Sequence, residues 1–166
     1  MRPNLAPTPA VQDLMSTDVG NDRPVVSFAG EHAFLSNFHP SIVHLDGVAY
    51  PTVEHAFQAA KCLDPRERGR IRDCSSPARA KSLGRRVSLR RDWEPMKLVV
   101  MESLVREKFS AHPDLKRALL ATGARHLVEG NTWGDTFWGV VFSRRRGRNH
   151  LGRILMRVRR KLQQMT

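Results

Sequence analysis

A carboxylic acid, an amide and an amine follow one another along a short segment, at Glu54, Gln58 and Lys61. Pro51 disfavours helix at the residue before it, and Thr52 is a good N-cap for the Ala-rich segment that follows. At about 100° per residue, the acid, the amide and the amine fall on one stripe of a helix. Helical side chains lean toward the N-terminus, so Lys61 leans back toward Glu54. The segment could therefore offer an acid and an amine to one small pocket.

The alternative interpretation of this stripe is a solvated charge pair on a surface helix. An adjacent, broader face of the same segment is apolar and can pack into a core; it consists of Val53, Ala56, Phe57, Ala60 and Leu63. Periodicity alone does not separate the two interpretations, so the rest of the chain has to decide between them.

Composition indicates a soluble protein of one domain, since 166 residues with 40% hydrophobic and 27% charged residues suit a single core. No apolar run reaches the length of a membrane span, and no signal peptide is evident. Cys62 and Cys74 form no CxxC pattern, so we expect neither a disulfide framework nor a metal site, and a cytoplasmic location. The net charge of +12 favours phosphate-bearing partners, either nucleic acid or a nucleotide.

The pattern of strands and helices predicts an N-terminal tail over residues 1–23, which we expect to be disordered, and one domain over 24–166. Short strands are expected at 25–28, 42–45, 48–50 and 126–129, with an Asp46-Gly47 hairpin turn. Helices are expected at about 65–73, 77–84, 92–110 and 113–122 and after Asn149, which would cap the last helix. The predicted inward stripe of the longest helix is Leu98, Met101, Val105 and Phe109, and the predicted outward face of the last is Arg153, Arg157, Arg159 and Arg160.

Two loops carry polar groups between aromatic residues. In the first, over 34–40, Ser36 and Asn37 could hold a sugar or base and Phe38 could stack on it. The alternative is a packed turn whose Asn37 satisfies local backbone groups.

The second loop, over 130–141, gathers tryptophans and glycines around one carboxylate; its candidate binding residues are Asn131, Trp133, Gly134, Asp135 and Trp138. Glycine allows close backbone approach to a ligand, and tryptophan supplies a flat stacking surface. Asp135 could hold ribose hydroxyls or assist proton transfer. The alternative is a tight turn in which Asp135 caps backbone N–H groups.

These motifs together resemble the NADAR, or YbiA-like, family. The resemblance covers roughly residues 25 to 163 in the expected order, and it is carried by Phe34-Leu35-Ser36-Asn37-Phe38, Tyr50-Pro51-Thr52-Val53-Glu54-His55 through Lys61, Ser76-Pro77-Ala78 with Lys81, Asp92-Trp93, Glu129-Gly130-Asn131, Trp133-Gly134-Asp135 and Trp138-Gly139. We see no departure from the family pattern at the candidate site positions.

The resemblance implies an α+β fold, mostly helical and packed around a small antiparallel sheet, and an N-glycosidase that needs no cofactor. Members cleave the bond between a ribose C1 and a base or amine. Some act on phosphorylated ribosylamino-pyrimidines of the riboflavin pathway, and others remove ADP-ribose from guanine in nucleic acid. The resemblance places Glu54 and Lys61 at the reacting carbon, with Asn37, Trp133 and Asp135 lining the pocket.

The mechanism predicted from these residues makes Lys61 a nucleophile and Glu54 the proton-transfer group. The positive charge favours ADP-ribosylated guanine in nucleic acid over the phosphorylated pyrimidine as substrate. A rival of another class is a module that binds ADP-ribose or nucleic acid without turnover, which the charge and the Trp-rich loop would serve equally well.

Overall fold

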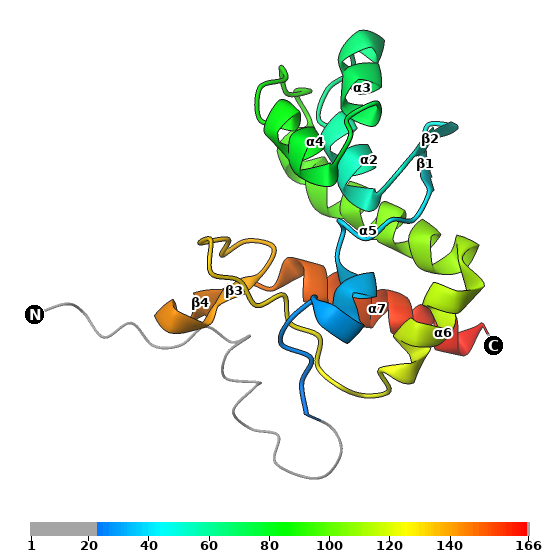
Figure 1. The fold of residues 1–166 in the computed structure, drawn as a ribbon, viewed down its shortest axis with the longest axis vertical. Helices are drawn as coiled ribbons and strands as arrows, with labels where there is room; N and C mark the ends of the chain where they lie inside the picture. Colours follow the sequence, from blue (N-terminus) through cyan, green and yellow to red (C-terminus); the bar gives the residue numbers. More distant parts are fainter. Residues whose placement is uncertain (1–22, 166) are drawn as a thin grey trace, which may run out of the picture.

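The computed structural model describes residues 23–165, and its elements are arranged around one long helix, α5 (Trp93–Ala111). This helix contacts α2 (Val53–Ala59), α6 (Pro113–Ala121), α7 (His150–Gln164) and the strand β1 (Val43–Leu45). In Figure 1 it runs obliquely across the molecule, between α2 above and α7 below. The predicted tail over 1–23 lies almost wholly outside the described residues.

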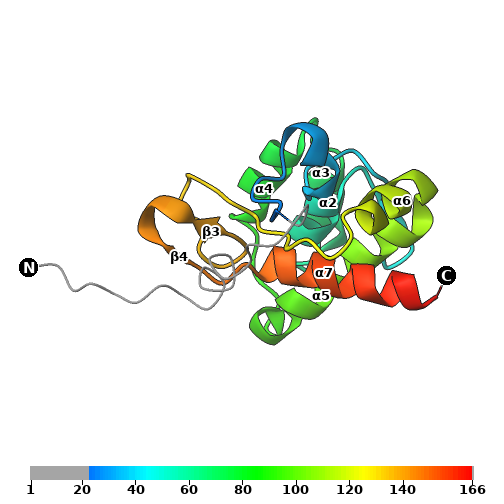
Figure 2. The same cartoon turned by 90° about the horizontal axis from the view of Figure 1, so that it is seen from below.

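The remaining helices group around α5 in two sets. α3 (Pro65–Arg72) and α4 (Pro77–Gly84) pack against α2 and against each other, whereas α6 and α7 contact α5 and each other. Figure 1 shows α7 below α5, on the side away from α3 and α4, and in Figure 2 α7 runs alongside α5. The 3₁₀ helix η1 (Gly30–Leu35) contacts α6 and leads into the Ser36–Phe38 loop. α2 therefore lies between the α3–α4 pair and α5.

The predicted hairpin is confirmed: β1 pairs antiparallel with β2 (Val48–Tyr50). Asp46 and Gly47 connect them with φ of 51° and 78°, the left-handed pair that a two-residue type I′ turn requires. A second antiparallel pair, β3 (Val140–Val141) with β4 (Arg146–Gly147), brackets the 3₁₀ helix η2 (Phe142–Arg144). The expected mostly helical α+β class is thus confirmed, with the antiparallel pairing divided between two small sheets.

Two predicted strands are shorter than expected. The segments 25–28 and 126–129 meet at a single parallel bridge between Val25 and Leu127, and Gly130 forms another bridge with Val140. Val25 exchanges both of its backbone hydrogen bonds with this partner segment, at 2.8 Å each. The next carbonyl, of Val26, packs so closely on Gly130 that a Cβ there would lie 2.3 Å from it, and no ladder continues.

Side-chain orientation on the two long helices differs from the prediction at two positions. Leu98, expected in the core, is 36% exposed, whereas Arg159, expected outside, is only 5% exposed. Arg159 donates from Nη1 to the buried Thr122 hydroxyl at 2.6 Å, a partner at the end of α6 that helical periodicity cannot reveal. Leu98 lines a surface hollow together with residues of α7, among them His150 and Met156, so no neighbouring side chain covers it fully.

Asn149, the expected cap of the last helix, and Asp92, which stands at the N-cap position of α5, make other contacts. Asn149 has a left-handed backbone (φ 50°) and makes no cap hydrogen bond to α7. Its side chain instead bridges two backbone groups, accepting from the Glu129 N–H at 3.1 Å and donating to the Leu127 carbonyl at 2.9 Å. Asp92 pairs with Arg90 at 2.6 Å. The Asn149 side chain thus fixes the segment that leads into the Trp-rich loop.

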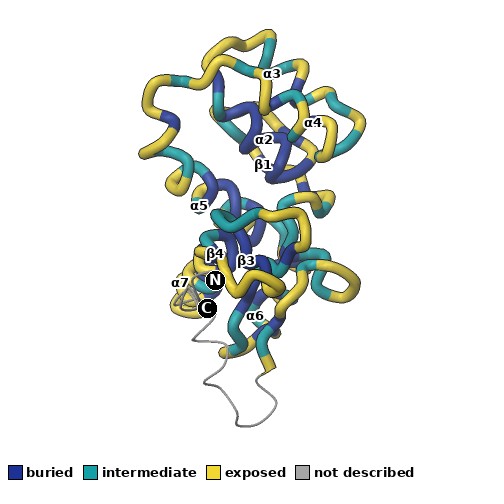
Figure 3. Tube along the Cα trace, turned by 90° about the vertical axis from the view of Figure 1, so that its left-hand side faces the viewer, coloured by how far each residue is buried: buried dark blue, intermediate teal, exposed yellow. Residues whose placement is uncertain are grey.

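The buried residues extend from α2 through the middle of α5 to α7, as the dark tube of Figure 3 shows. Every residue of α2 is buried, including Glu54, His55 and Gln58. Among the described residues, no helix has the length and apolar character needed to cross a membrane.

Candidate active site

α2 begins where the sequence predicts. The Thr52 hydroxyl accepts a hydrogen bond from the His55 amide at 3.2 Å, which satisfies one of the free N–H groups of the first turn. The α-helix ends at Ala59, and Lys61 follows in the adjoining turn. Glu54 and Gln58 are therefore one helical turn apart, with Lys61 just beyond the last turn.

Glu54 is buried, with 5% of its surface exposed. Its Oε1 accepts a hydrogen bond from Gln58 Nε2 at 2.8 Å. Burial raises the pKa of Glu54, the hydrogen bond from Gln58 and the charges of Lys81 and Lys61 oppose that rise, and the charge of Asp135 adds to it. The acid thus lies among two amines and a second carboxylate, and the interpretation of a solvated surface pair does not fit this burial.

Lys61 is part-buried beside the same acid. Its Nζ donates to the Gly84 carbonyl at 3.5 Å and lies 6.0 Å from the centroid of the Phe57 ring. Burial lowers its pKa; Glu54 raises it, and Lys81 and Arg85 lower it further. Lysine is a nucleophile only as the neutral amine, so this direction favours the predicted role.

Lys81, which the sequence analysis named only among the residues that carry the family resemblance, also acts on Glu54, since its charge lowers the pKa of that acid. It projects from α4, and its Nζ lies 5.8 Å from the centroid of the Phe38 ring. α4 approaches α2 closely at Gly84, where a Cβ would lie 2.1 Å from Gln58 Oε1. We call Glu54, Gln58, Lys61 and Lys81 the helix wall of the site.

The Ser36–Phe38 loop is attached to the start of this wall. The Asn37 carbonyl accepts from the Glu54 amide at 3.1 Å, and the Asn37 side chain donates to Met101 Sδ at 3.4 Å. The Ser36 hydroxyl accepts from the Phe38 amide at 3.1 Å, as expected of a packed turn. Phe38 is 37% exposed, so its ring faces outward beside Lys81. The structure thus brings this loop to Glu54 and also uses its polar groups to stabilise the turn.

Lys108 supports the loop from the core. It is 1% exposed, and its Nζ donates to the Ser36 carbonyl at 2.8 Å. Burial lowers the pKa of Lys108 to about 7. A lysine in an otherwise apolar helix face thus holds the backbone of this loop from the core side, opposite the contact of Lys81 with the Phe38 ring.

The second predicted loop is held by its own polar side chains. Asn131 Oδ1 accepts from the amides of Gly134 and Asp135, and its Nδ2 donates to the Asp135 carbonyl at 2.7 Å. Asp135 Oδ1 accepts from the amides of Phe137 and Trp138 at 2.9 and 2.8 Å. Asp135 therefore does cap backbone groups, while its charge still reaches Glu54.

The two tryptophans of this loop have different surroundings. Trp138 packs edge-on against Phe57 of α2, with ring centroids 5.3 Å apart, and against Phe137 at 4.9 Å. Trp133 is 68% exposed and precedes Gly134, whose φ of 90° requires glycine. Trp138 therefore fixes the loop to the helix wall, and Trp133 presents its indole to solvent. We call residues 129–138 the loop wall.

Glu129 is the other residue that the sequence analysis missed, because it was taken as the last residue of a strand. Burial, the largest cause, and the charges of Asp135 and Glu54 together raise the pKa of Glu129 to about 7, against the lowering effect of Lys81. The charged groups of the two walls therefore act on one another. A glutamate directly before a Gly-Asn turn is the sequence signal that could have drawn attention to it.

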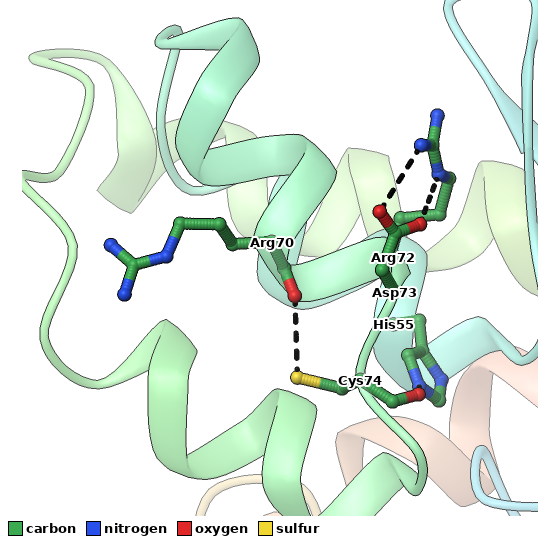
Figure 4. Close-up of polar contacts among 5 residues, drawn as sticks. All are labelled: His55, Arg70, Arg72, Asp73 and Cys74. Atoms are coloured by element: carbon green, nitrogen blue, oxygen red, sulfur yellow. Dashed lines mark hydrogen bonds and ion pairs between the residues drawn. The ribbon is translucent and has the colours of Figure 1, made fainter.

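Two surface hollows lie elsewhere. One, of about 490 Å³, is lined by residues of the α3–α4 region, including Arg70, Cys74 and Arg79, and the other, of about 660 Å³, lies along α7 and the side of α5. Figure 4 shows the first region, where the Cys74 thiol donates to the Arg70 carbonyl and the His55 ring lies at the Cys74 carbonyl, 3.2 Å away. Neither hollow is lined by a predicted site residue.

The two walls together offer two carboxyl groups of raised pKa and two amines whose charges act on them, a set that suits proton transfer and attack on an electrophilic carbon. Among residues 23–165, no group of three or more His, Cys, Asp or Glu side chains is placed to hold a metal ion.

Comparison with known proteins defines the class. Residues 26–163 match the NADAR domain family, so the chain belongs to that family. The matched range includes both walls of the site.

Individual relatives carry names that describe an activity. N-glycosidase YbiA of Escherichia coli is 41% identical over 138 residues, which cover 82% of this chain and 85% of the relative. An N-glycosidase of Nostoc punctiforme is 38% identical, over 79% of this chain and 86% of the relative. A riboflavin biosynthesis protein of Vibrio vulnificus is 40% identical over 80% of this chain, but only 36% of that longer protein is covered.

The solved NMR structure of E. coli YbiA has the same fold. It superposes with a TM-score of 0.75 at 37% sequence identity, covering 93% of this chain and 94% of the other.

Proposed function

We propose that this protein is an N-glycosidase that hydrolyses the bond between ribose C1 and a guanine base of ADP-ribosylated nucleic acid. The observation that carries the proposal is the convergence of Glu54 and Lys61 on the helix wall, each with a pKa shifted toward its neutral form by burial. Membership of a family whose relatives are named N-glycosidases supports the reaction type.

In the proposed reaction, Lys61 attacks C1 of the ring-opened ribosylamine. Its neutral Nζ adds to the C1=N bond, the departing base nitrogen leaves with the bond's electron pair and a proton, and a C1=N bond to Lys61 results. Water then adds to this Schiff base and releases the ribose as its aldehyde. Glu54 takes the proton from the attacking amine and later from water. Gln58 would orient the Glu54 carboxyl for this transfer through their hydrogen bond.

The choice of a nucleic-acid substrate rests on the surface beside the loop wall. Exposed arginines follow that wall on the η2–β4 hairpin, at Arg144, Arg145, Arg146 and Arg148. The hairpin is tied to the wall, because the Arg148 amide donates to the Thr136 carbonyl at 2.9 Å. With Trp133 exposed on the same loop, a base could stack while flanking phosphates meet the arginines.

A second candidate substrate is a phosphorylated ribosylamino-pyrimidine. It is favoured by the relative of V. vulnificus, which is named a riboflavin biosynthesis protein. Its single phosphate would need far fewer arginines than the hairpin presents. A non-catalytic protein that binds ADP-ribose or nucleic acid is the rival hypothesis of another class. It differs from the proposed enzyme in releasing no product.

The deciding experiment incubates the protein with a single-stranded oligonucleotide bearing ADP-ribosyl-guanine and, in parallel, with the ribosylamino-pyrimidine phosphate. We expect release of ADP-ribose from the first at the higher kcat/KM, and a covalent adduct on borohydride addition that Lys61→Ala removes. Preference for the pyrimidine would transfer the proposal to the second candidate. Saturable binding without product would refute the enzyme and support the non-catalytic binding module. An active Lys61→Ala variant would refute the role of Lys61 as nucleophile.

A further inference from the structure

Two fully buried side-chain oxygens of the described residues have no hydrogen-bond partner in the protein: Gln58 Oε1 and Glu129 Oε2. Buried polar atoms are nearly always paired, because leaving one unpaired costs free energy, and exceptions gather at functional sites. Gln58 already contacts Glu54 through its amide nitrogen. Glu129 is the exception that the proposed mechanism leaves without a role.

The backbone of Glu129 is fixed on both sides. Its N–H donates to Asn149 Oδ1 at 3.1 Å, and its carbonyl accepts from the Val140 amide at 2.8 Å. Gly139 packs against that carbonyl so closely that a Cβ would lie 2.2 Å away. Residue Glu129 as a whole is part-buried, whereas its Oε2 is fully buried, so the carboxyl lies at the edge of the core. A rigid main chain thus presents an unpaired acid from the loop wall.

The two glutamates of the site have different surroundings. Burial raises the pKa of both, but at Glu54 a hydrogen bond from Gln58 and the charges of two lysines oppose the rise. At Glu129 two carboxylates, Asp135 and Glu54, add to it, and only Lys81 opposes it. Pairs of carboxyl groups in such unlike environments commonly divide the roles of base and acid.

We propose that Glu129 is a catalytic residue of this site, an acid that protonates the departing base nitrogen from the loop wall while Glu54 and Lys61 act at C1 from the helix wall. The inference rests on the proposed N-glycosidase function. As the C1–N bond breaks, its electron pair stays on nitrogen, which receives the Glu129 proton. The resulting carboxylate regains a proton from water once the base has left.

Leaving-group dependence tests this assignment directly. Two ribosylamines are compared: one releases a guanine nitrogen, which departs poorly without a proton, and the other releases a nitro-substituted aromatic amine, which departs readily. Glu129→Gln should lower kcat for the guanine substrate by about a hundredfold or more and leave the nitro-substituted one within a few fold of wild type. The matched control, Glu67→Gln on the surface of α3, should change neither.

The wild-type pH profile gives a second readout that needs no variant. For the guanine substrate, kcat/KM should fall as pH rises through about 7, and this fall should disappear with the nitro-substituted leaving group. Equal losses for both substrates in Glu129→Gln, or a wild-type fall that is the same for both, would overturn the acid role. Cleavage of neither substrate by wild type would instead refute the proposed function, independently of Glu129.

Discussion

The helix wall and the loop wall hold charged groups by different means. On the helix wall, regular backbone hydrogen bonds fix the positions, and the buried acid is partnered by a side chain, Gln58. On the loop wall, side chains fix the backbone, since Asn131 and Asp135 within the wall and Asn149 outside it all hydrogen-bond to its main-chain groups. The buried acid there, Glu129, is left with an unpaired oxygen. The comparison indicates that most polar side chains of a loop hydrogen-bond to the loop's own backbone. Few then remain to pair with a buried, reactive side chain such as Glu129.

The largest effect is expected from the helix wall. Glu54→Gln should reduce kcat by about a hundred- to ten-thousandfold, because the amide cannot accept a proton from Lys61 or water. Its shape and its contact with Gln58 are retained, so the melting temperature should change little. Rate measurements alongside thermal unfolding check this, with Glu67→Gln as the surface control. Wild-type kcat in Glu54→Gln would remove Glu54 from the mechanism.

Two close-packed glycines, Gly139 beside the loop wall and Gly84 beside the helix wall, allow each wall to be perturbed separately by substitution with alanine. In Gly139→Ala the new Cβ would meet the Glu129 carbonyl at 2.2 Å, a backbone atom that cannot move alone. In Gly84→Ala it would meet Gln58 Oε1 at 2.1 Å, the end of a side chain. Gly139→Ala should therefore lower the free energy of unfolding by about 3 kcal/mol, and Gly84→Ala by about 1 kcal/mol. Gly84→Ala should also lose activity, because its new Cβ turns Gln58 away from Glu54.

Gly69→Ala is the matched control for both glycine variants. Gly69 lies inside α3 with nothing within 4 Å of its added Cβ, so alanine should stabilise the protein by about 0.5–1 kcal/mol. Chemical denaturation of the three variants gives the ranking. A Gly84→Ala protein with full activity would show that the contact between Gln58 and Glu54 does not matter for catalysis.

Stability against pH should separate the loop-wall acid from the lysine behind the Ser36 loop. The folded pKa of Glu129 is raised from 4.5 to about 7, so its contribution to stability falls as pH rises through that window, by about 2–3 kcal/mol. The pKa of Lys108 is lowered from 10.5 to about 7, so its contribution rises as pH increases between those values. Unfolding free energies measured from pH 5 to pH 10 should therefore pass through a minimum near neutrality.

Single variants assign the two limbs of that pH curve. Glu129→Gln should flatten the fall on the acidic side, and Lys108→Met should flatten the rise on the basic side, leaving the opposite limb in each case. If Glu129→Gln left the acidic limb intact, the raised pKa of Glu129 would be refuted. The environments of the buried acids Glu129 and Glu54 would then differ less than proposed.

The smallest effect is expected at the exposed tip of the loop wall. Trp133→Ala should leave stability unchanged, since the side chain is 68% exposed, and should raise KM for the oligonucleotide by about five- to a hundredfold through lost base stacking. Trp138→Ala, its counterpart packed on Phe57, should instead lower the melting temperature. Steady-state kinetics and thermal unfolding of the pair check this, and an unchanged KM in Trp133→Ala would exclude stacking by that indole.

The part of the helix wall that α2 and its adjoining turn supply could be predicted from sequence because its determinants are local, whereas Lys81, on α4, could not. Thr52 as a cap and the spacing of Glu54 and Gln58 already define a helix and a stripe. Glu129 could not be found in this way, since its backbone is fixed by Asn149, twenty residues further along the chain. Arg159 was misplaced for the same reason, because Thr122, its partner, lies on a different helix.

Asp135 shows that two interpretations of a residue need not exclude each other. The sequence left open whether it caps backbone groups or serves a ligand, and the structure shows the capping contacts while its charge acts on both glutamates. Such long-range electrostatic effects depend on the distance between walls, which no motif specifies.

The hydrogen bond from the Glu54 amide to the Asn37 carbonyl has a mechanical consequence. It makes the polar loop an extension of the first turn of α2, so that a displacement of Asn37 would strip a helix-terminal N–H of its acceptor. A ligand that displaces the Ser36–Phe38 loop would therefore also displace the backbone of Glu54, with no hinge or other element between the two. Ligand binding at the loop and bond cleavage at Glu54 would then be coupled by a single backbone hydrogen bond.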